Sequence, residues 1–180
     1  MSDLLDRLRK LVEAGEVRIS EHGYDELSED QIPVRDAIRG IREAVLVEEY
    51  PASGRGPAVL VLEYGEDHQP LHVVWGIPAG HETPAVLVTA YRPNPEKMAQ
   101  RLFDEAEMNT RKRVKYIREG KYAAEVDVDL IEDETKWSPY LSVEDAEKLD
   151  DVRAALARGD IEEASKKARV YTLHPVAASQ

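Results

Sequence analysis

Four short apolar runs between residues 44 and 91 constrain the fold of this chain more than any other feature. Each run is rich in Val, Leu or Ile and is bounded by Pro or Gly, which is typical of β-strands. The runs are Ala44–Tyr50, Ala58–Tyr64, Leu71–Ile77 and Ala85–Tyr91. The connections between them are short and lack the periodicity of a crossover helix. The pattern therefore predicts an antiparallel meander rather than a parallel sheet.

Helical patterns flank these strands. Asp3–Ala14 carries leucines at helical spacing, and a short strand over Val17–Ser20 ends in a serine that can cap a following helix. Pro33 is expected to begin another helix, because its missing N–H costs nothing in the first turn. A last helix is expected over Glu96–Glu107. Residues 1–107 are thus predicted to form an α+β unit in which helices pack on a four-stranded antiparallel sheet.

A second, smaller unit is expected over residues 108–180. It opens after Met108 with a basic segment, Asn109–Lys115. The elements predicted beyond it are a strand over Tyr122–Ile131, a loop over Trp137–Leu141, two helices capped by Ser142 and Asp160, and a closing strand over Val170–Leu173. Both caps are residue types whose side chains accept hydrogen bonds from the first turn of a helix. The pattern predicts a strand combined with a helical hairpin.

Composition excludes several classes of protein. The chain has no Cys, so neither a disulfide framework nor a Cys-based zinc site can form. No stretch approaches the roughly 20 apolar residues that span a bilayer, and Met1–Lys10 lacks the apolar core of a signal peptide. We therefore expect a cytoplasmic protein with no membrane partner.

The net charge of −12 is unevenly distributed. Residues 1–107 hold 11 Lys and Arg against 21 Asp and Glu, a net of −10, whereas residues 108–180 hold 13 against 15, a net of −2. A net-acidic protein does not suit loose, sequence-blind binding to nucleic acid. Any site for a polyanion must be a local basic patch.

Polar side chains at strand and helix ends of the first unit are candidates for chemistry. The candidate catalytic residues are His22, His72, Tyr91 and Arg92, and the candidate phosphate-binding residues are Arg35, Arg39 and Arg42. A metal-independent ribonuclease needs a base for the ribose 2′-hydroxyl, an acid for the departing 5′-oxygen and a cation for the charge on phosphorus. Histidine titrates near neutrality, and the guanidinium fork matches phosphate geometry.

Each candidate also has a structural interpretation. His22 near a helix start is equally a surface or capping residue, and Tyr91 can simply pack at a strand end. His72 alternates with Leu71 and Val73, so it points to the face opposite Leu71, Val73 and Trp75 and is equally an ordinary strand residue. The three arginines, at spacings of four and three, are equally a solvated helix face.

Metal and cofactor chemistry finds little support in the sequence. His68 and His72 are four residues apart, but Pro70 argues against the helix that a zinc pair of this spacing needs. No Gly-rich phosphate loop, nucleophile elbow or dinucleotide fingerprint is present. We expect no metal and no cofactor.

Four stretches together resemble a bacterial toxin family of the RelE/ParE type, in the branch with a leading Ser-x-His motif. They are Ile19–Tyr24, Val45–Pro51, Pro70–Gly76 and Val86–Pro93. The resemblance covers about residues 17–95. It implies a RelE-like fold, with helices on a twisted antiparallel sheet, and an RNA-cleaving activity that halts translation. It also implies that His22, His72, Tyr91 and Arg92 belong to the catalytic site.

Residues 108–180 resemble the small partner protein found beside such toxins. The matching stretches are Tyr122–Val126, Trp137–Leu141, the two helices and Ala168–Tyr171. The resemblance implies a toxin and its antitoxin in one chain, with the second unit covering the active face of the first. Trp137, Tyr140 and Leu141 are the expected anchors, because aromatic residues often carry interface energy. The alternative is that Trp137 and Tyr140 pack inside their own unit.

Two further hypotheses remain open from the sequence. In the first, the RelE-like sheet is a non-catalytic scaffold that binds nucleic acid or protein, and Arg111–Lys115 contacts DNA, although no DNA-binding motif is present. In the second, the chain is a structural α/β protein with no activity. Under the toxin hypothesis, the partner of the freed first unit is RNA or the ribosome.

Overall fold

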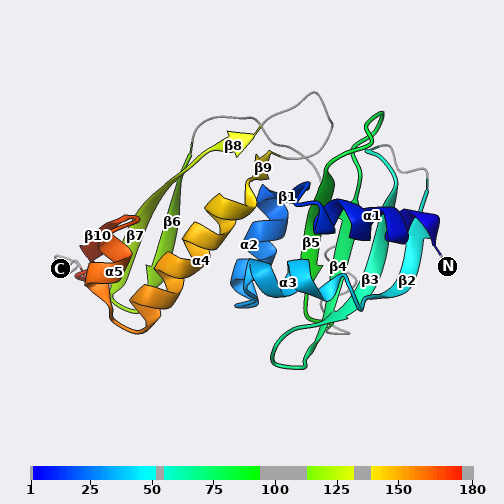
Figure 1. Cartoon of the computed structure of the whole chain (residues 1–180). Coiled ribbons are helices and arrows are strands. Elements are labelled where there is room, and N and C mark those ends of the chain that lie inside the picture. The colour runs from blue at the N-terminus through cyan, green and yellow to red at the C-terminus, as the bar shows by residue number, and fades with distance from the viewer. Residues whose placement is uncertain (1, 52–54, 94–112, 132–138, 176–180) are drawn as a thin grey trace, which may run out of the picture.

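The computed structural model describes residues 2–51, 55–93, 113–131 and 139–175 (Figure 1). The helices are α1 (Asp3–Glu13), α2 (Glu21–Glu29), α3 (Val34–Gly40), α4 (Val143–Ala157) and α5 (Ile161–Ser165). The strands are β1 (Val17–Ser20), β2 (Val45–Tyr50), β3 (Ala58–Tyr64), β4 (Pro70–Gly76), β5 (Ala85–Tyr91), β6 (Arg113–Glu119), β7 (Tyr122–Val128), β8 (Leu130–Ile131), β9 (Tyr140–Leu141) and β10 (Arg169–Thr172). The fold is mixed α+β. The helix expected over Glu96–Glu107 lies outside the described residues.

The antiparallel meander predicted from the four apolar runs is confirmed. Strands β2, β3, β4 and β5 pair in chain order, with Val61 opposite Val73 at the centre of the β3–β4 pair. Burial alternates along β4, so Leu71, Val73 and Trp75 face the core. The period-two alternation of β4 reflects one face packed against helices and one face turned away from them, whereas β3 and β5 are buried at four consecutive positions.

The sheet is larger than the four strands expected, and this part of the prediction was wrong. Its order is β2-β3-β4-β5-β1-β9-β8. β1 runs parallel to β5, with Ile19 opposite Leu87, and β9 runs antiparallel to β1, with Ile19 opposite Leu141. β8 and β9 are only two residues long and lie far from β1 in sequence. Pairing of this kind is set by tertiary packing and leaves no local pattern.

A second sheet has the order β10-β7-β6. Its strand β6 begins at Arg113, within the basic segment Asn109–Lys115, for which no strand was predicted. Ile117 of β6 is buried against α4, whereas Tyr116 is exposed, so the strand has one packed face. The β6–β7 turn contains Gly120 at φ +55°, a backbone conformation that glycine adopts without steric cost.

Capping side chains begin the helices where the sequence predicted them. Ser20 accepts a hydrogen bond from the N–H of Gly23 at 2.8 Å and so starts α2. Ser142 accepts one from Asp145 at 3.0 Å, and Asp160 accepts one from Glu163 at 3.1 Å. These bonds satisfy backbone donors that have no partner inside the helix.

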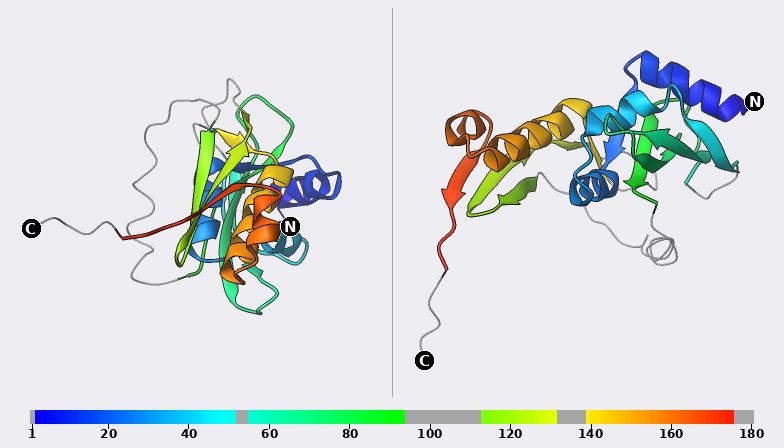
Figure 2. Two further views of the ribbon diagram at one scale, coloured as in Figure 1. Left: turned by 90° about the vertical axis from the view of Figure 1, so that its left-hand side faces the viewer. Right: turned by 90° about the horizontal axis from the view of Figure 1, so that it is seen from below.

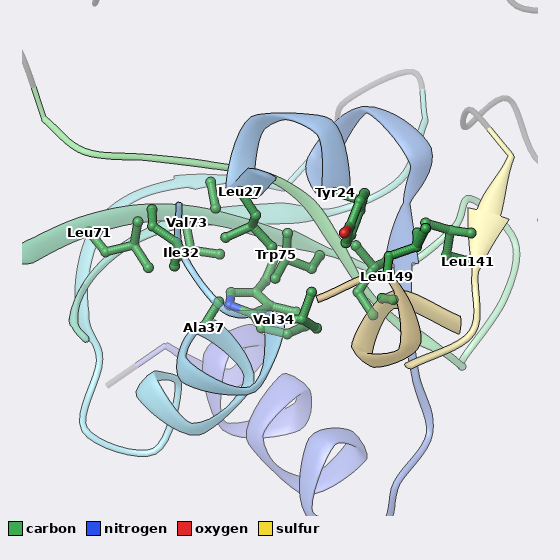
Figure 3. Close-up of a cluster of buried hydrophobic side chains, with 14 of the residues drawn as sticks. Tyr24, Leu27, Ile32, Val34, Ala37, Leu71, Val73, Trp75, Leu141 and Leu149 are labelled. Carbon is green, nitrogen blue, oxygen red and sulfur yellow. The ribbon is translucent and has the colours of Figure 1, made fainter. Parts of the chain in front are cut away.

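One hydrophobic core runs through both sheets. Figure 3 shows side chains of α2 (Tyr24, Leu27), α3 (Val34, Ala37), β4 (Leu71, Val73, Trp75), β9 (Leu141) and α4 (Leu149) gathered in one cluster. α4 lies between the small sheet and α3, contacting both (Figure 2). Within the described residues, no helix is long and apolar enough to cross a membrane.

Candidate functional site

His72 and Tyr91 form the closest grouping of the predicted catalytic residues. They are direct cross-strand partners on β4 and β5. Their rings meet edge to face, with centroids 5.4 Å apart and planes at 80°. As predicted, His72 points away from the core face that carries Leu71, Val73 and Trp75. The two side chains therefore lie on the sheet face opposite α1 and α3.

Burial shapes the electrostatics of His72. Desolvation lowers the pKa of its imidazole, because removing water disfavours the charged ring. Its Nδ1 atom is buried and has no hydrogen-bond partner within the described part of the chain. The ring is accordingly neutral at neutral pH, the form in which histidine accepts a proton.

Arg92 does not share this face with His72 and Tyr91. It lines a pocket of about 230 Å³ together with Leu71, which is on the core side of β4. Its guanidinium is 2.6 Å from the Asp67 carboxylate, and its backbone N–H donates to Asp30 at 2.9 Å. The N–H of Gln69 and then the Arg92 guanidinium hold the pKa of Asp67 below its usual value.

The three predicted phosphate-binding arginines are divided between two pockets. Arg39 and Arg42 line one of about 220 Å³, where the Arg39 guanidinium is 2.7 Å from the Glu66 carboxylate. Arg35 lines a different pocket, beside α4. The structure thus does not bring the three guanidinium groups together, and one of them is already neutralised by a carboxylate.

His22 is exposed on the first turn of α2 and makes no hydrogen bond or ion pair with any described residue. Beside it, Glu21 is almost fully buried, and its carboxylate lies 3.0 Å from Lys115 of β6. The same ammonium group lies 2.8 Å from Asp25. These ion pairs join α2 to the basic segment that begins the smaller sheet.

Tyr140 and Leu141 lie where the two expected units meet. The predicted loop was wrong here, since both residues form β9 and pair with Ser20 and Ile19 of β1. Both side chains are buried, and the Arg18 guanidinium lies 5.6 Å from the centre of the Tyr140 ring. The third expected anchor, Trp137, lies outside the described residues.

A polar network that sequence reasoning missed also joins the two units. Asp150 of α4 accepts hydrogen bonds from the Val34 N–H at 2.9 Å and from the Tyr24 hydroxyl at 3.3 Å. Arg153, one turn later, donates to Tyr24 at 3.4 Å and to Ser28. The only sequence signal was that Arg153 falls on the otherwise apolar stripe of α4.

Burial sets the ionisation of this network. It raises the pKa of Asp150, although the Val34 N–H and Arg153 act in the opposite direction. It also raises the pKa of Tyr24, so the phenol stays protonated and remains a donor at physiological pH.

Glu63 is a second residue that the sequence analysis missed. It occupies a core-facing position of β3 after Val59 and Val61 and is 1% exposed. Trp75 Nε1–H donates to Glu63 Oε1 at 2.9 Å, whereas Oε2 has no partner within the described residues. Burial raises the pKa of Glu63 to about 8. The sequence signal was a charged residue at a position of the strand where alternation with Val59 and Val61 predicts a buried side chain.

Within the described residues, no group of three or more His, Asp or Glu side chains is arranged to hold a metal ion.

Comparison with known proteins gives a match to a family model. Residues 19–92 match a family model described as a domain of unknown function, DUF4258. The match extends from β1 to just beyond β5 and includes His22, His72, Tyr91 and Arg92, whereas the small sheet and α4 lie beyond it. No curated protein matches the chain. No solved structure matches it.

Proposed function

We propose that this chain is a toxin and its antitoxin in one polypeptide. Residues 2–93 are a RelE/ParE-like domain that cleaves RNA in the cytoplasm without a metal and halts translation. Residues 113–175 restrain it. The observation that carries the proposal is the pairing of β9 with β1, by which the second unit extends the sheet of the first.

The contact between the units has the character of a specific interface. Addition of a strand to a sheet edge supplies main-chain hydrogen bonds, one mode by which proteins bind extended segments. Leu141 and Leu149 enter the common core (Figure 3). Asp150 and Arg153 bind polar groups of α2 and α3. Tethering raises the effective concentration of the inhibitory unit, so undocking is opposed even where single contacts are weak.

The proposed chemistry uses His72 and Tyr91. Neutral His72 takes the proton from the ribose 2′-hydroxyl, and Tyr91, its edge-to-face neighbour, protonates the departing 5′-oxygen. Arg92 supplies the cation for the phosphorus centre after its guanidinium turns from the pocket beside Leu71 to the face of the sheet that carries His72 and Tyr91. Because its guanidinium is paired with Asp67, that ion pair must open before the arginine engages phosphate.

The second candidate is a non-catalytic binding module. It is favoured by two ion pairs, Arg39 with Glu66 and Arg92 with Asp67, which neutralise two arginines of residues 1–107, the part of the chain with a net charge of −10. Such a charge repels RNA at long range. Under this proposal, residues 2–93 bind a basic protein rather than RNA.

Bacterial growth separates the two proposals. We would induce residues 1–107, the full chain, and the full chain with Asp150→Lys and Arg153→Glu, which places repulsive charges at the junction. The toxin proposal expects arrest by the first and third proteins but not by the second. His72→Ala in residues 1–107 should restore growth, whereas His81→Ala, in an exposed loop, should not.

If the short form accumulates in folded form and leaves growth and total RNA unchanged, the ribonuclease proposal fails. Capture of a basic protein by the undocked full chain, in that case, supports the binding-module proposal.

A further inference from the structure

A pocket of about 230 Å³ lies at the junction of α3, α4 and α5. Its lining residues are Arg35, Asp151, Val152, Ala154, Arg158, Glu163 and Lys167. Arg35 comes from the part of the chain that matches the family model, and the other lining residues come from the part beyond it. The pocket exists only when α4 and α5 are docked on α3. We refer to it as the junction pocket.

The charges around the junction pocket do not balance. Asp151 lies 2.5 Å from Lys167, and Glu163 lies 2.6 Å from Lys166, so both carboxylates are occupied by lysines. Arg35 and Arg158 are exposed, and their guanidinium groups make no hydrogen bond or ion pair with any residue that the structure describes. Arg35 and Arg158 are thus the cations that line this pocket without an ion-pair partner among the described residues, although Asp36 and Asp150 lie within electrostatic range of Arg35.

We propose that the junction pocket binds a phosphate group of a small molecule, held between Arg35 and Arg158. Two arginine forks from separate helices match the several acceptor oxygens of a phosphate, and charge-assisted hydrogen bonds of this kind are among the strongest in proteins. A chloride ion offers no comparable set of directed acceptors. Macromolecular polyanions are disfavoured, because the chain as a whole carries a net charge of −12.

Ligand binding has a consequence for the junction itself. A phosphate held by α3 on one side and by the end of α4 on the other favours the docked arrangement, because a ligand stabilises the state that binds it. Bound phosphate would thus hold the two parts of the chain together, and we call this effect the clamp. It goes beyond the proposed toxin function and does not depend on it, since the clamp acts whatever residues 2–93 do.

The test is isothermal titration of the full chain with inorganic phosphate, pyrophosphate and adenosine 5′-monophosphate, at constant ionic strength set with sodium chloride. We expect saturable binding of one phosphate probe per chain and a concentration-dependent rise in Tm. Arg35→Ala and Arg158→Ala should each weaken the affinity by at least about tenfold, the loss typical of one charge-assisted contact. Strong preference for the monophosphate would identify a nucleotide-like ligand, and equal affinity would identify phosphate itself.

The matched control is Arg118→Ala, which removes an exposed arginine from β6, away from the junction pocket, and should leave the affinity unchanged. Arg35→Lys and Arg158→Lys keep the charge but lose the fork, so they should weaken binding even if an alanine variant folds poorly. The proposal is overturned if the heat of titration does not saturate with phosphate concentration. It is also overturned if the Arg35→Ala and Arg118→Ala variants bind phosphate with equal affinity. Both outcomes leave the growth experiment on the toxin proposal unaffected.

Discussion

The carboxylate of Asp150 accepts a hydrogen bond of 2.9 Å from the backbone N–H of Val34, although 116 positions separate the two residues. Val34 is the first residue of α3, where the backbone N–H groups have no partner inside the helix. The residue before it, Pro33, provides no capping side chain. An aspartate from α4 therefore supplies the cap that the local sequence lacks.

Asp150→Asn should lower the free energy of unfolding by about 1–3 kcal/mol, because it removes a half-buried charge-assisted acceptor and leaves its partners poorly satisfied. Asp151→Asn is the matched control. That aspartate is exposed and pairs with exposed Lys167, so its loss should change stability by less than about 1 kcal/mol. Urea denaturation of both variants measures the difference. Equal effects would show that Asp150 does not cap α3 in solution.

The buried carboxyl of Glu63 predicts a pH dependence of stability. Its pKa is about 8 in the folded protein and near 4.5, the ordinary value for glutamate, when the chain is unfolded. Between these values the unfolded chain releases the proton while the folded chain keeps it, so stability falls as the pH rises from 4.5 to 8 and levels off above. Glu63→Gln should remove this fall in the free energy of unfolding, because glutamine does not titrate, and its side-chain oxygen still accepts a hydrogen bond from Trp75.

The Glu63→Gln variant should therefore gain stability over the unmodified chain at pH 8, by a few kcal/mol in order of magnitude, and much less at pH 5. Urea denaturation at both pH values measures the difference in free energy of unfolding between the variant and the unmodified chain. Glu66→Gln, which alters an exposed carboxylate that pairs with Arg39, controls for general charge effects. If this difference in the free energy of unfolding is the same at both pH values, Glu63 does not titrate in this range.

Gly40→Ala tests the packing beside the same carboxyl. Glycine in a helix is ordinarily less stable than alanine by about 0.5–1 kcal/mol. Here an added Cβ would clash with Glu63 Oε2 and lie 3.0 Å from Glu63 Cβ. We expect Gly40→Ala to destabilise the protein by about 1–3 kcal/mol, the usual cost of overpacking. A double variant with Glu63→Ala should recover part of that loss; additive effects of the two changes would contradict the contact.

Two serine caps with different surroundings give a paired test. Ser20 Oγ accepts from Gly23 and also donates to the Val88 carbonyl at 2.6 Å, and the group is buried. Ser142 makes the cap bond to Asp145. Ser142→Ala should cost about 1 kcal/mol, whereas Ser20→Ala should cost about 2–3 kcal/mol, because it also leaves a buried carbonyl unpaired. Thermal unfolding compares them, and equal losses would contradict the role of the Val88 bond.

The sequence predicts the features that local patterns determine. The alternation of Leu71, Val73 and Trp75 with His72 places the histidine on the correct face of β4, and the residue types of Ser20 and Ser142 locate two helix starts. In each case the physical cause acts within a few residues, either side-chain alternation along a strand or a cap on the first turn of a helix.

Features that depend on distant residues were not predictable. Nothing near Tyr140 indicates that it pairs with Ser20, because a two-residue strand has no period. Spacing alone likewise suggested that Arg35 acts with Arg39, but α4 docks beside Arg35 and places it in the junction pocket. The candidate site was therefore only partly foreseen: His72 and Tyr91 are neighbours, and Arg92 points to a different pocket.

The position of β1 in the sheet has a consequence for synthesis on the ribosome. β5 is complete at residue 91, but β9, which covers the other side of β1, is complete only at residue 141. At 5–20 residues per second, the intervening segment of about 50 residues takes roughly 3–10 s to translate. Every nascent chain thus carries β1 with one uncovered side for seconds, long after the meander has been translated. A harmful first unit would be restrained only if its encounter with a target is slower than this interval.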